Sequence, residues 1–223
     1  MAKARLLAPW VERERRSAVY HCVSRVIHRQ MLLGDAEKEQ FVKYMRMYEA
    51  FCGVRVLSFC VMTNHFHILL EVPPSMENEL SDEALIARLS LLYSKEYVGQ
   101  VAMRLRDLSE STTENGRKAH EELREKFTRR MWDLGSFMKT LKQRFTSWYN
   151  ARHGRCGTLW EARYKSVLVE NGEAARVMAA YIDLNPIRAN MTKDPAKYRW
   201  CSYAEAVAGG DQGALARRGI ARV

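Results

Sequence analysis

Residues 61–72 read VMTNHFHILLEV, and this stretch decides how the rest of the chain folds. From His65 onward it is a candidate strand with two unlike faces, because successive side chains of a strand point to opposite sides. One face is wholly apolar and comprises Phe66, Ile68, Leu70 and Val72. The other face begins with two imidazoles and comprises His65, His67, Leu69 and Glu71. The apolar face predicts a strand that lies beneath helices.

The two histidines of this strand are a candidate metal site. Each residue of a strand rises about 3.3 Å, which places the two imidazoles roughly 6–7 Å apart along the strand. At that separation both rings can reach one metal ion. The same pattern also describes two histidines on a solvated face with no ligand, and the spacing alone leaves both interpretations open.

The charge balance favours a polyanionic partner. The 223 residues include 36 Lys and Arg against 26 Asp and Glu, which gives a formal net charge of +10. Such a balance favours nucleic acid first and an anionic membrane surface second. Hydrophobic residues make up 47% of the chain, which is enough for a packed core and excludes wholesale disorder.

The cysteine pattern and the hydropathy bear on the compartment. The five cysteines lie far apart without a Cys-x-x-Cys pair, so neither a zinc ribbon nor a disulfide framework is expected. No run of apolar residues approaches the length that spans a membrane, and the first residues do not read as a signal peptide. We therefore expect a cytoplasmic protein with no membrane segment.

The periodicity of the chain predicts an α+β fold. Apolar residues at helical spacing, such as Phe41, Tyr44, Met45 and Tyr48, alternate with stretches rich in β-branched residues. The expected core elements are strands at 18–27, 54–62, 65–72 and 159–169 and helices at 35–52 and 117–151. The order β-α-β-β-α-β is that of a ferredoxin-like antiparallel sheet with helices on one face. The histidines are then expected on the open face of the sheet.

A helical segment interrupts this order, and a second set of short elements follows it. We expect one domain over residues 1–223 with a helical insertion at about residues 76–134. A first helix of the insertion is expected from Ser81 to Leu105, followed by a polar loop. After the last strand a short helix at 174–184 is stopped by Pro186, which cannot supply a backbone donor. The tail from Gly209 is expected to be flexible.

The short helix before Pro186 carries a second candidate set of chemical groups. Tyr181 and Asn185 are four residues apart, so the phenol and the amide project from the same side of a helix. A tyrosine with its ordinary pKa of about 10 needs help to act as a nucleophile near neutral pH. A metal ion that polarises a phosphoryl oxygen supplies such help. Taken alone, Tyr181 is one of ten tyrosines and fits a core or surface position better than a catalytic one.

Four blocks of the sequence resemble single-tyrosine HUH transposases, and in particular their REP-associated branch. Residues 62–70 (MTNHFHILL) are similar to the His-hydrophobic-His signature of that family. Further similar blocks are residues 157–166 (GTLWEARYKS), 181–189 (YIDLNPIRA) and 198–203 (YRWCSY). The blocks occur in family order and span about residues 18–205, apart from the insertion.

The resemblance implies an endonuclease and strand transferase that acts on single-stranded DNA, with hairpin-bearing repeats as the expected target. It implies that Tyr181 attacks a DNA phosphate to form a 5′-phosphotyrosine link. By position His65 and His67 are metal ligands, and Asn185 is the third ligand. Two imidazoles with one amide oxygen leave coordination positions open, and suit Mn²⁺ or Mg²⁺. The oligomeric state is left open between a monomer and a homodimer.

Several other residues are candidates for contacts with DNA. Cationic side chains that could contact backbone phosphates are Arg25, Arg163, Lys165 and Arg188. Their alternative is ordinary surface charge. Trp160 and Tyr164 fit stacking on bases or packing in the core, and His21 fits an approach to the metal or a structural role.

Three alternatives remain open at this point. Tyr149 is a rival nucleophile, although its neighbours offer no matching ligand. The chain could instead be a ferredoxin-like module that binds nucleic acid without cleaving it. It could also be a metal-dependent nuclease that uses water, with Tyr181 in a structural role.

Overall fold

A four-stranded antiparallel sheet forms the centre of the molecule, with strand order β2-β3-β1-β4. The computed structural model describes residue 8, residues 10–170 and residues 172–223. The strands are Ala18–Arg25 (β1), Arg55–Val61 (β2), His65–Val72 (β3) and Lys165–Val169 (β4). The predicted α+β class and antiparallel sheet are confirmed. The expected fourth strand is shorter than predicted, because residues before Lys165 make only an isolated bridge between Trp160 and Val26.

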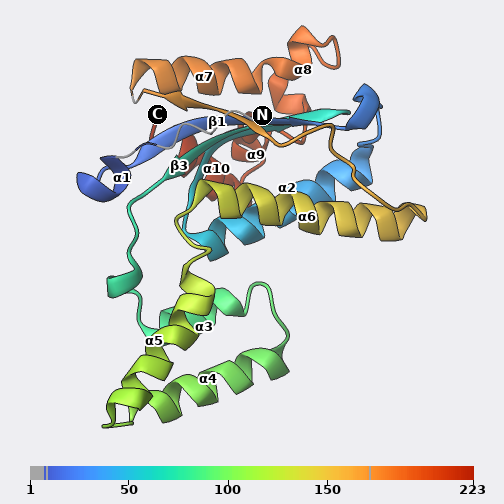
Figure 1. Cartoon of the computed structure of the whole chain (residues 1–223). Helices are drawn as coiled ribbons and strands as arrows, with labels where there is room; N and C mark the ends of the chain where they lie inside the picture. Colours follow the sequence, from blue (N-terminus) through green and yellow to red (C-terminus); the bar gives the residue numbers. More distant parts are fainter. Residues whose placement is uncertain (1–7, 9, 171) are drawn as a thin grey trace.

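Two long helices cover the apolar face of β3, as predicted. They are Asp35–Cys52 (α2) and Leu134–His153 (α6), which lie together below the sheet in Figure 1. The α2 helix ends at Gly53 in the left-handed conformation (φ 69°), which glycine adopts without a steric penalty. The α6 helix begins at Asp133, whose Oδ1 accepts a hydrogen bond from the backbone N–H of Ser136. Phe66 of β3 is fully buried beneath these helices.

The other face of the sheet is not open, contrary to the expectation of helices on one face only. Helix α7, Glu173–Asp183, lies across it in Figure 1. Its apolar residues Ala175, Ala179 and Ile182 recur at i, i+4 and i+7 and pack into one cluster with Leu69 of β3. An apolar stripe of this kind is stable when it packs against another element, and here it packs against this face of the sheet.

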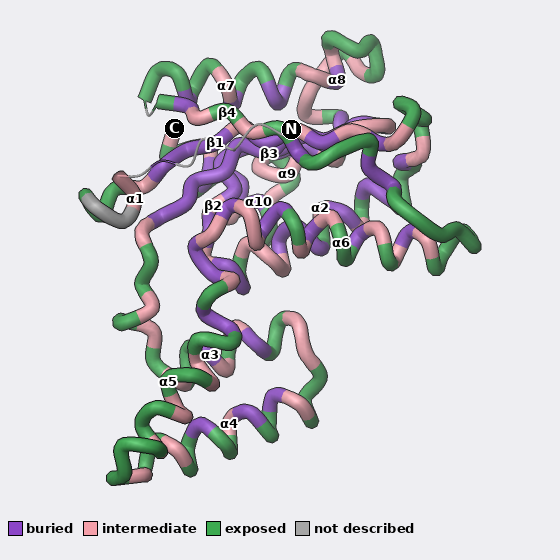
Figure 2. The backbone as a smooth tube through the Cα atoms, in the orientation of Figure 1, coloured by how far each residue is buried: buried purple, intermediate pink, exposed green. Residues whose placement is uncertain are grey.

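Several helices lie between β3 and α6, over the residues where the helical insertion is predicted. Its helices are Glu77–Glu79 (η2), Asp82–Leu89 (α3), Lys95–Ser109 (α4) and Glu114–Thr128 (α5). Figures 1 and 2 show them as a lobe that projects from the sheet and its helices, with much of its surface exposed. The single helix expected from Ser81 to Leu105 is wrong. The chain breaks after Leu89, and Ser94 caps a new helix by accepting a hydrogen bond from the N–H of Tyr97.

The lobe is attached to the C-terminal end of α2. The backbone N–H of Trp132 donates to the carbonyl of Cys52 (2.7 Å). The guanidinium of Arg88 donates to the carbonyl of Phe51 (3.1 Å). Both carbonyls belong to the last turn of α2, where backbone acceptors have no partner within the helix. The lobe therefore supplies hydrogen bonds to carbonyls that the helix leaves without a partner.

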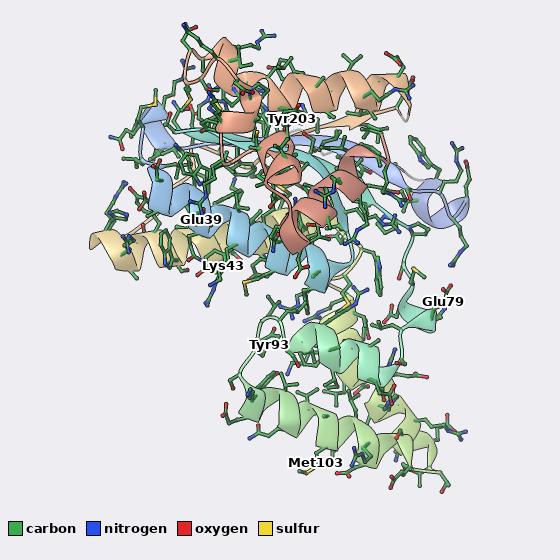
Figure 3. The ribbon with its side chains drawn as sticks, turned by 180° about the vertical axis from the view of Figure 1, so that it is seen from behind. Glu39, Lys43, Glu79, Tyr93, Met103 and Tyr203 are labelled. Atoms are coloured by element: carbon green, nitrogen blue, oxygen red, sulfur yellow. The ribbon has the colours of Figure 1, made fainter. Side chains whose placement is uncertain are left out.

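The C-terminal segment is helical, and the predicted flexible tail is wrong. Helices Ser202–Ala208 (α9) and Gly210–Ile220 (α10) pack against β2, and Figure 3 shows them from behind. Beyond α10 the side chain of Arg222 donates two hydrogen bonds to Glu71 of β3 (2.9 and 3.2 Å). Remaining short elements are Trp10–Arg13 (α1), Ile27–Arg29 (η1), Asn185–Arg188 (α8) and Pro195–Lys197 (η3). None of the described helices combines the length and the apolar character that a membrane crossing requires.

Two glycine substitutions test the docking of α10. A Cβ atom at Gly219 would lie 2.6 Å from the carbonyl oxygen of Val56 and 2.9 Å from that of Leu57, both backbone atoms of β2. We expect Gly219→Ala to lower the free energy of unfolding by about 1–3 kcal/mol, since overpacking forces the two elements apart. The matched control is Gly99→Ala in α4, where nothing lies within 4 Å and alanine should add about 0.5–1 kcal/mol. Urea unfolding measures both, and equal effects would show that α10 is not docked.

Candidate active site

The two histidines of β3 lie at the rim of the sheet face that α7 covers. Their ring centroids are 5.0 Å apart, and His67 is only 7% exposed. Arg25 of β1 pairs with His65, and Val23 pairs with His67. The register of the antiparallel pair therefore places a cation beside the first histidine.

The ring of His65 is held by a chain of hydrogen bonds that determines which nitrogen carries the proton. The amide nitrogen of Asn64 donates to the carbonyl of Arg29 (3.0 Å), so the amide oxygen faces the other way. That oxygen lies 2.7 Å from Nδ1 of His65 and accepts its proton. In this tautomer Nε2 of His65 carries a lone pair, as a metal ligand must.

Both histidines are neutral at physiological pH. Burial, helped by the nearby Arg25 guanidinium, lowers the pKa of His65 to about 4. Burial also lowers the pKa of His67 to about 3, with further contributions from His65, His21 and Arg25. Neutral imidazoles are the form that binds metal ions, so no proton has to be displaced when a cation arrives.

Helix α7 brings Tyr181 over the histidines. Its ring centroid is 6.1 Å from that of His67, with the ring planes nearly perpendicular. Tyr181 is 37% exposed, whereas Ala179 and Ile182 on the inner face of the same helix are buried. The fold therefore joins two residues that are more than a hundred positions apart in the sequence.

Asn185 lies just beyond the end of α7, as the first residue of α8. Its amide nitrogen donates to the carbonyls of Tyr181 (2.9 Å) and Ile182 (3.2 Å). These bonds use the amide donor and leave the oxygen Oδ1 as the atom that could coordinate a cation. The described hydrogen bonds of Asn185 stay within its own helix end and do not reach His65 or His67.

The predicted donor set fits a divalent cation with open coordination positions. His65 offers a fixed lone pair, both imidazoles are neutral, and Asn185 offers an amide oxygen. Among the described residues, no three or more His, Cys, Asp or Glu side chains form a group that could hold a metal ion. The predicted set contains only two such side chains, so the third ligand would have to be the amide.

Three of the four predicted DNA-contacting cations lie around this site. Arg25 is beside His65, and Lys165 pairs with Val23, which pairs in turn with His67 on the same face. The guanidinium of Arg188 lies over the ring of Tyr181, 5.1 Å from its centroid. Arg163, by contrast, lines a groove of about 1160 Å³ between α6 and the segment that precedes β4.

Comparison with known proteins bears on the family. The family model described as "Transposase IS200 like" matches residues 15–110. Residues 15–110 are therefore similar to the IS200-like transposases. A solved structure titled "Structure of the REP associates tyrosine transposase bound to a REP hairpin" has a similar fold, with a TM-score of 0.56. The two chains are 12% identical over 95% of this chain and 93% of the other. No curated protein matches the sequence.

The segment that the family model matches contains both histidines but ends before Tyr181 and Asn185. The roles of those two residues therefore rest on the sequence resemblance and on the geometry above. The rival nucleophile Tyr149 is in a different environment. It is 4% exposed, stacks on His153 at 4.3 Å and belongs to the core beneath the other face of the sheet.

The structure also shows the positions of three residues whose roles the sequence left open. Trp160 and Tyr164 are buried in the core of the molecule, so they pack rather than present a stacking surface. His21 lies on the histidine face, where its Nε2 is 2.9 Å from Nδ1 of His67. Only the register between β1 and β3 reveals this contact, because His21 is outside the His-hydrophobic-His motif.

The lowered pKa values predict how the histidines titrate. Because the folded pKa of each ring lies below the ordinary value of about 6.5, the neutral form should persist well into the acid range. In metal-free protein we expect the ring nitrogen chemical shifts of His65 and His67 to stay those of neutral imidazole at about pH 5.5. The same titration in urea provides the control, and both rings should then protonate near pH 6.5. A folded-state midpoint near 6.5 for either ring would contradict the desolvated site.

Proposed function

We propose that the chain is a metal-dependent endonuclease and strand transferase that nicks and rejoins single-stranded DNA through Tyr181. The observation that carries the proposal is the position of the Tyr181 ring, edge-on to His67 and delivered by a helix that is buried against the histidine face. The phenol is exposed, whereas the groups that hold it are not. A nucleophile needs this combination of access and fixed position.

The proposed reaction is a transesterification at phosphorus. The phenolic oxygen of Tyr181 forms a bond to the phosphorus of a DNA phosphodiester, and the bond from phosphorus to the 3′ oxygen breaks. The products are a 5′-phosphotyrosine link and a strand with a free 3′-hydroxyl, which takes up a proton. Attack by the 3′-hydroxyl of another strand end reverses the step and releases the tyrosine. The bond energy is conserved, so rejoining requires no external energy source.

His65, His67 and Asn185 are the residues that would hold a divalent cation, Mn²⁺ or Mg²⁺. When bound, such an ion would polarise the phosphoryl oxygen and stabilise the charge that develops on it. The chain itself supplies a second positive group, since the Arg188 guanidinium lies over the Tyr181 ring. That position favours a phosphate beside the nucleophile.

The substrate is proposed to be an unpaired strand, beside or within a hairpin-bearing repeat. Arg25, Lys165 and Arg188 surround the site, and phosphate contacts of this kind position a backbone without reading its sequence. Arg163 would contact the strand further from Tyr181. The solved structure with a similar fold is bound to a REP hairpin, which supports a hairpin partner for this chain. The cytoplasmic location and the choice between monomer and homodimer stay predictions.

Tyr181→Phe tests the nucleophile. The substitution removes one oxygen and keeps the ring, so the variant should fold and bind DNA but form no covalent adduct and no nick. The matched control is Tyr203→Phe on α9, another exposed tyrosine, labelled in Figure 3, which should cleave like the wild type. The measurement is a denaturing gel of labelled single strand, followed by mass spectrometry of the nucleotide-bearing peptide.

The products separate the alternatives. Cleavage by Tyr181→Phe with a free 5′-phosphate would indicate a water nuclease. An adduct on Tyr149 or any other tyrosine would end the assignment of Tyr181. Binding by the wild type without any cleavage, in Mn²⁺ or Mg²⁺, would leave only a nucleic-acid-binding module.

The form of the substrate provides a second test. A stacked duplex holds its backbone in a geometry that a tyrosine at the rim of a sheet cannot meet in line. We therefore expect nicking of single-stranded DNA, or of the unpaired foot of a hairpin, and little nicking of a perfect duplex. Binding to a single strand should weaken with salt, with a log–log slope of roughly −0.7 for each phosphate neutralised. Equal cleavage rates on matched single- and double-stranded oligonucleotides would overturn the proposed substrate.

A further inference from the structure

His21 and His67 form a hydrogen-bonded pair of imidazoles at the centre of the site. Nε2 of His21 is 2.9 Å from Nδ1 of His67, and the ring planes are nearly parallel (10°) with centroids 5.2 Å apart. His21 also lies edge-on to the ring of Tyr181, with centroids 6.4 Å apart. The proposed function assigns no role to His21.

The pairing of β1 with β3 keeps this contact in place. His21 lies opposite Leu69 and Val23 lies opposite His67, so the two histidines are diagonal neighbours on one face. The neighbouring residue Cys22 is fully buried on the other face. A slip of one residue would turn His21 away from His67 and bring Cys22 out of the core. The core therefore fixes the distance between the two imidazoles.

The hydrogen bond restricts which atom of His67 can bind a cation. Nδ1 is occupied by His21, so only Nε2 remains. The pair can be arranged in two ways, because either ring can supply the shared proton. If His67 donates from Nδ1, its Nε2 carries a lone pair and can coordinate. If His21 donates instead, Nε2 of His67 carries a proton and cannot coordinate.

We propose that His21 is a positioning residue that accepts the Nδ1 proton of His67 and so keeps Nε2 of His67 free for the metal ion. The inference rests on the proposed function, since it assumes that His67 is a metal ligand. His21 would do for His67 what Asn64 does for His65, where an amide oxygen accepts the Nδ1 proton. Each of the two ligands then has its own acceptor. Acceptors behind histidine ligands orient the ring and raise its basicity toward the metal.

Two kinds of substitution separate this role from simple packing. His21→Phe keeps a ring of similar size and removes the acceptor. His21→Gln retains an oxygen that can reach the place of Nε2, whereas the shorter side chain in His21→Asn reaches only the place of Nδ1. If His21 acts as the acceptor, the phenylalanine and asparagine variants should bind the metal ion more weakly, and the glutamine variant should bind it like the wild type. If His21 only fills space, metal affinity should not follow that order.

The experiment measures Mn²⁺ binding to the metal-free full chain without DNA, from the electron paramagnetic resonance signal of free Mn²⁺. We expect His21→Phe and His21→Asn to weaken binding about 10–100-fold, and His21→Gln to stay within about threefold of the wild type. His153→Phe at the end of α6 is the matched control, because it makes the same change far from the site and should bind like the wild type. Thermal unfolding in EDTA shows whether each variant is folded. If the phenylalanine variant does not fold, the comparison of asparagine with glutamine decides.

The outcomes distinguish a failure of the inference about His21 from a failure of the proposed metal site. If the wild type binds Mn²⁺ and His65→Ala does not, the metal site stands, and the order of the His21 variants tests His21 alone. Folded His21→Phe or His21→Asn with wild-type affinity would overturn the role of His21. Equal losses of Mn²⁺ affinity in His21→Asn and His21→Gln would also overturn the role of His21. If the wild type itself binds no Mn²⁺, the metal site fails, and the inference fails with it.

Discussion

The alternation of side chains along β3 is the constraint on which the rest of the structure depends. Every residue of this strand from Phe66 to Val72 is buried, because helices cover both faces of the sheet. Phe66 and Ile68 enter the core beneath α2 and α6, whereas Leu69 enters the cluster beneath α7. A shift of one residue would exchange these two sets and place imidazoles in an apolar core. Unpartnered polar groups are costly to bury, so the packing of both faces holds the strand in a single register.

The same packing produces the electrostatics of the site. Helix α7 removes water from the face that carries His65 and His67, and desolvation is the main reason why both imidazoles have lowered pKa values. The helix ends where the histidines begin, so Tyr181 emerges at the rim with its phenol exposed. One helix thus excludes water from the two proposed ligands and positions the proposed nucleophile. Cations at the edge of the site, Arg25 and Arg188, add positive charge that suits a phosphate.

The end of α7 is anchored by a buried carboxyl. Asp183, two residues beyond Tyr181, accepts hydrogen bonds from the backbone N–H of Tyr203 (3.1 Å) and from the hydroxyl of Ser58 (3.4 Å). Burial raises the pKa of this carboxyl to about 7, so its environment is strongly desolvated. These contacts connect α7 with the first turn of α9 and with β2. The C-terminal helices, which pack on β2, therefore contribute to the position of Tyr181 even though they lie outside the site.

Local pattern was enough to determine several features from the sequence alone. The two-residue period of residues 65–72 and the helical period around Phe41 depend only on which residues are apolar, and they predicted β3 and α2 correctly. What the tertiary structure decided was every relation between segments. The tail from Gly209 was predicted as flexible because its helix gains its stability from contact with β2, which no local pattern shows. The contact between His21 and His67 depends on the register of two strands more than forty residues apart. The cover that α7 provides over the histidine face arises because its apolar stripe and that face bury one another, and the free energy of that burial belongs to the pair of surfaces rather than to either segment.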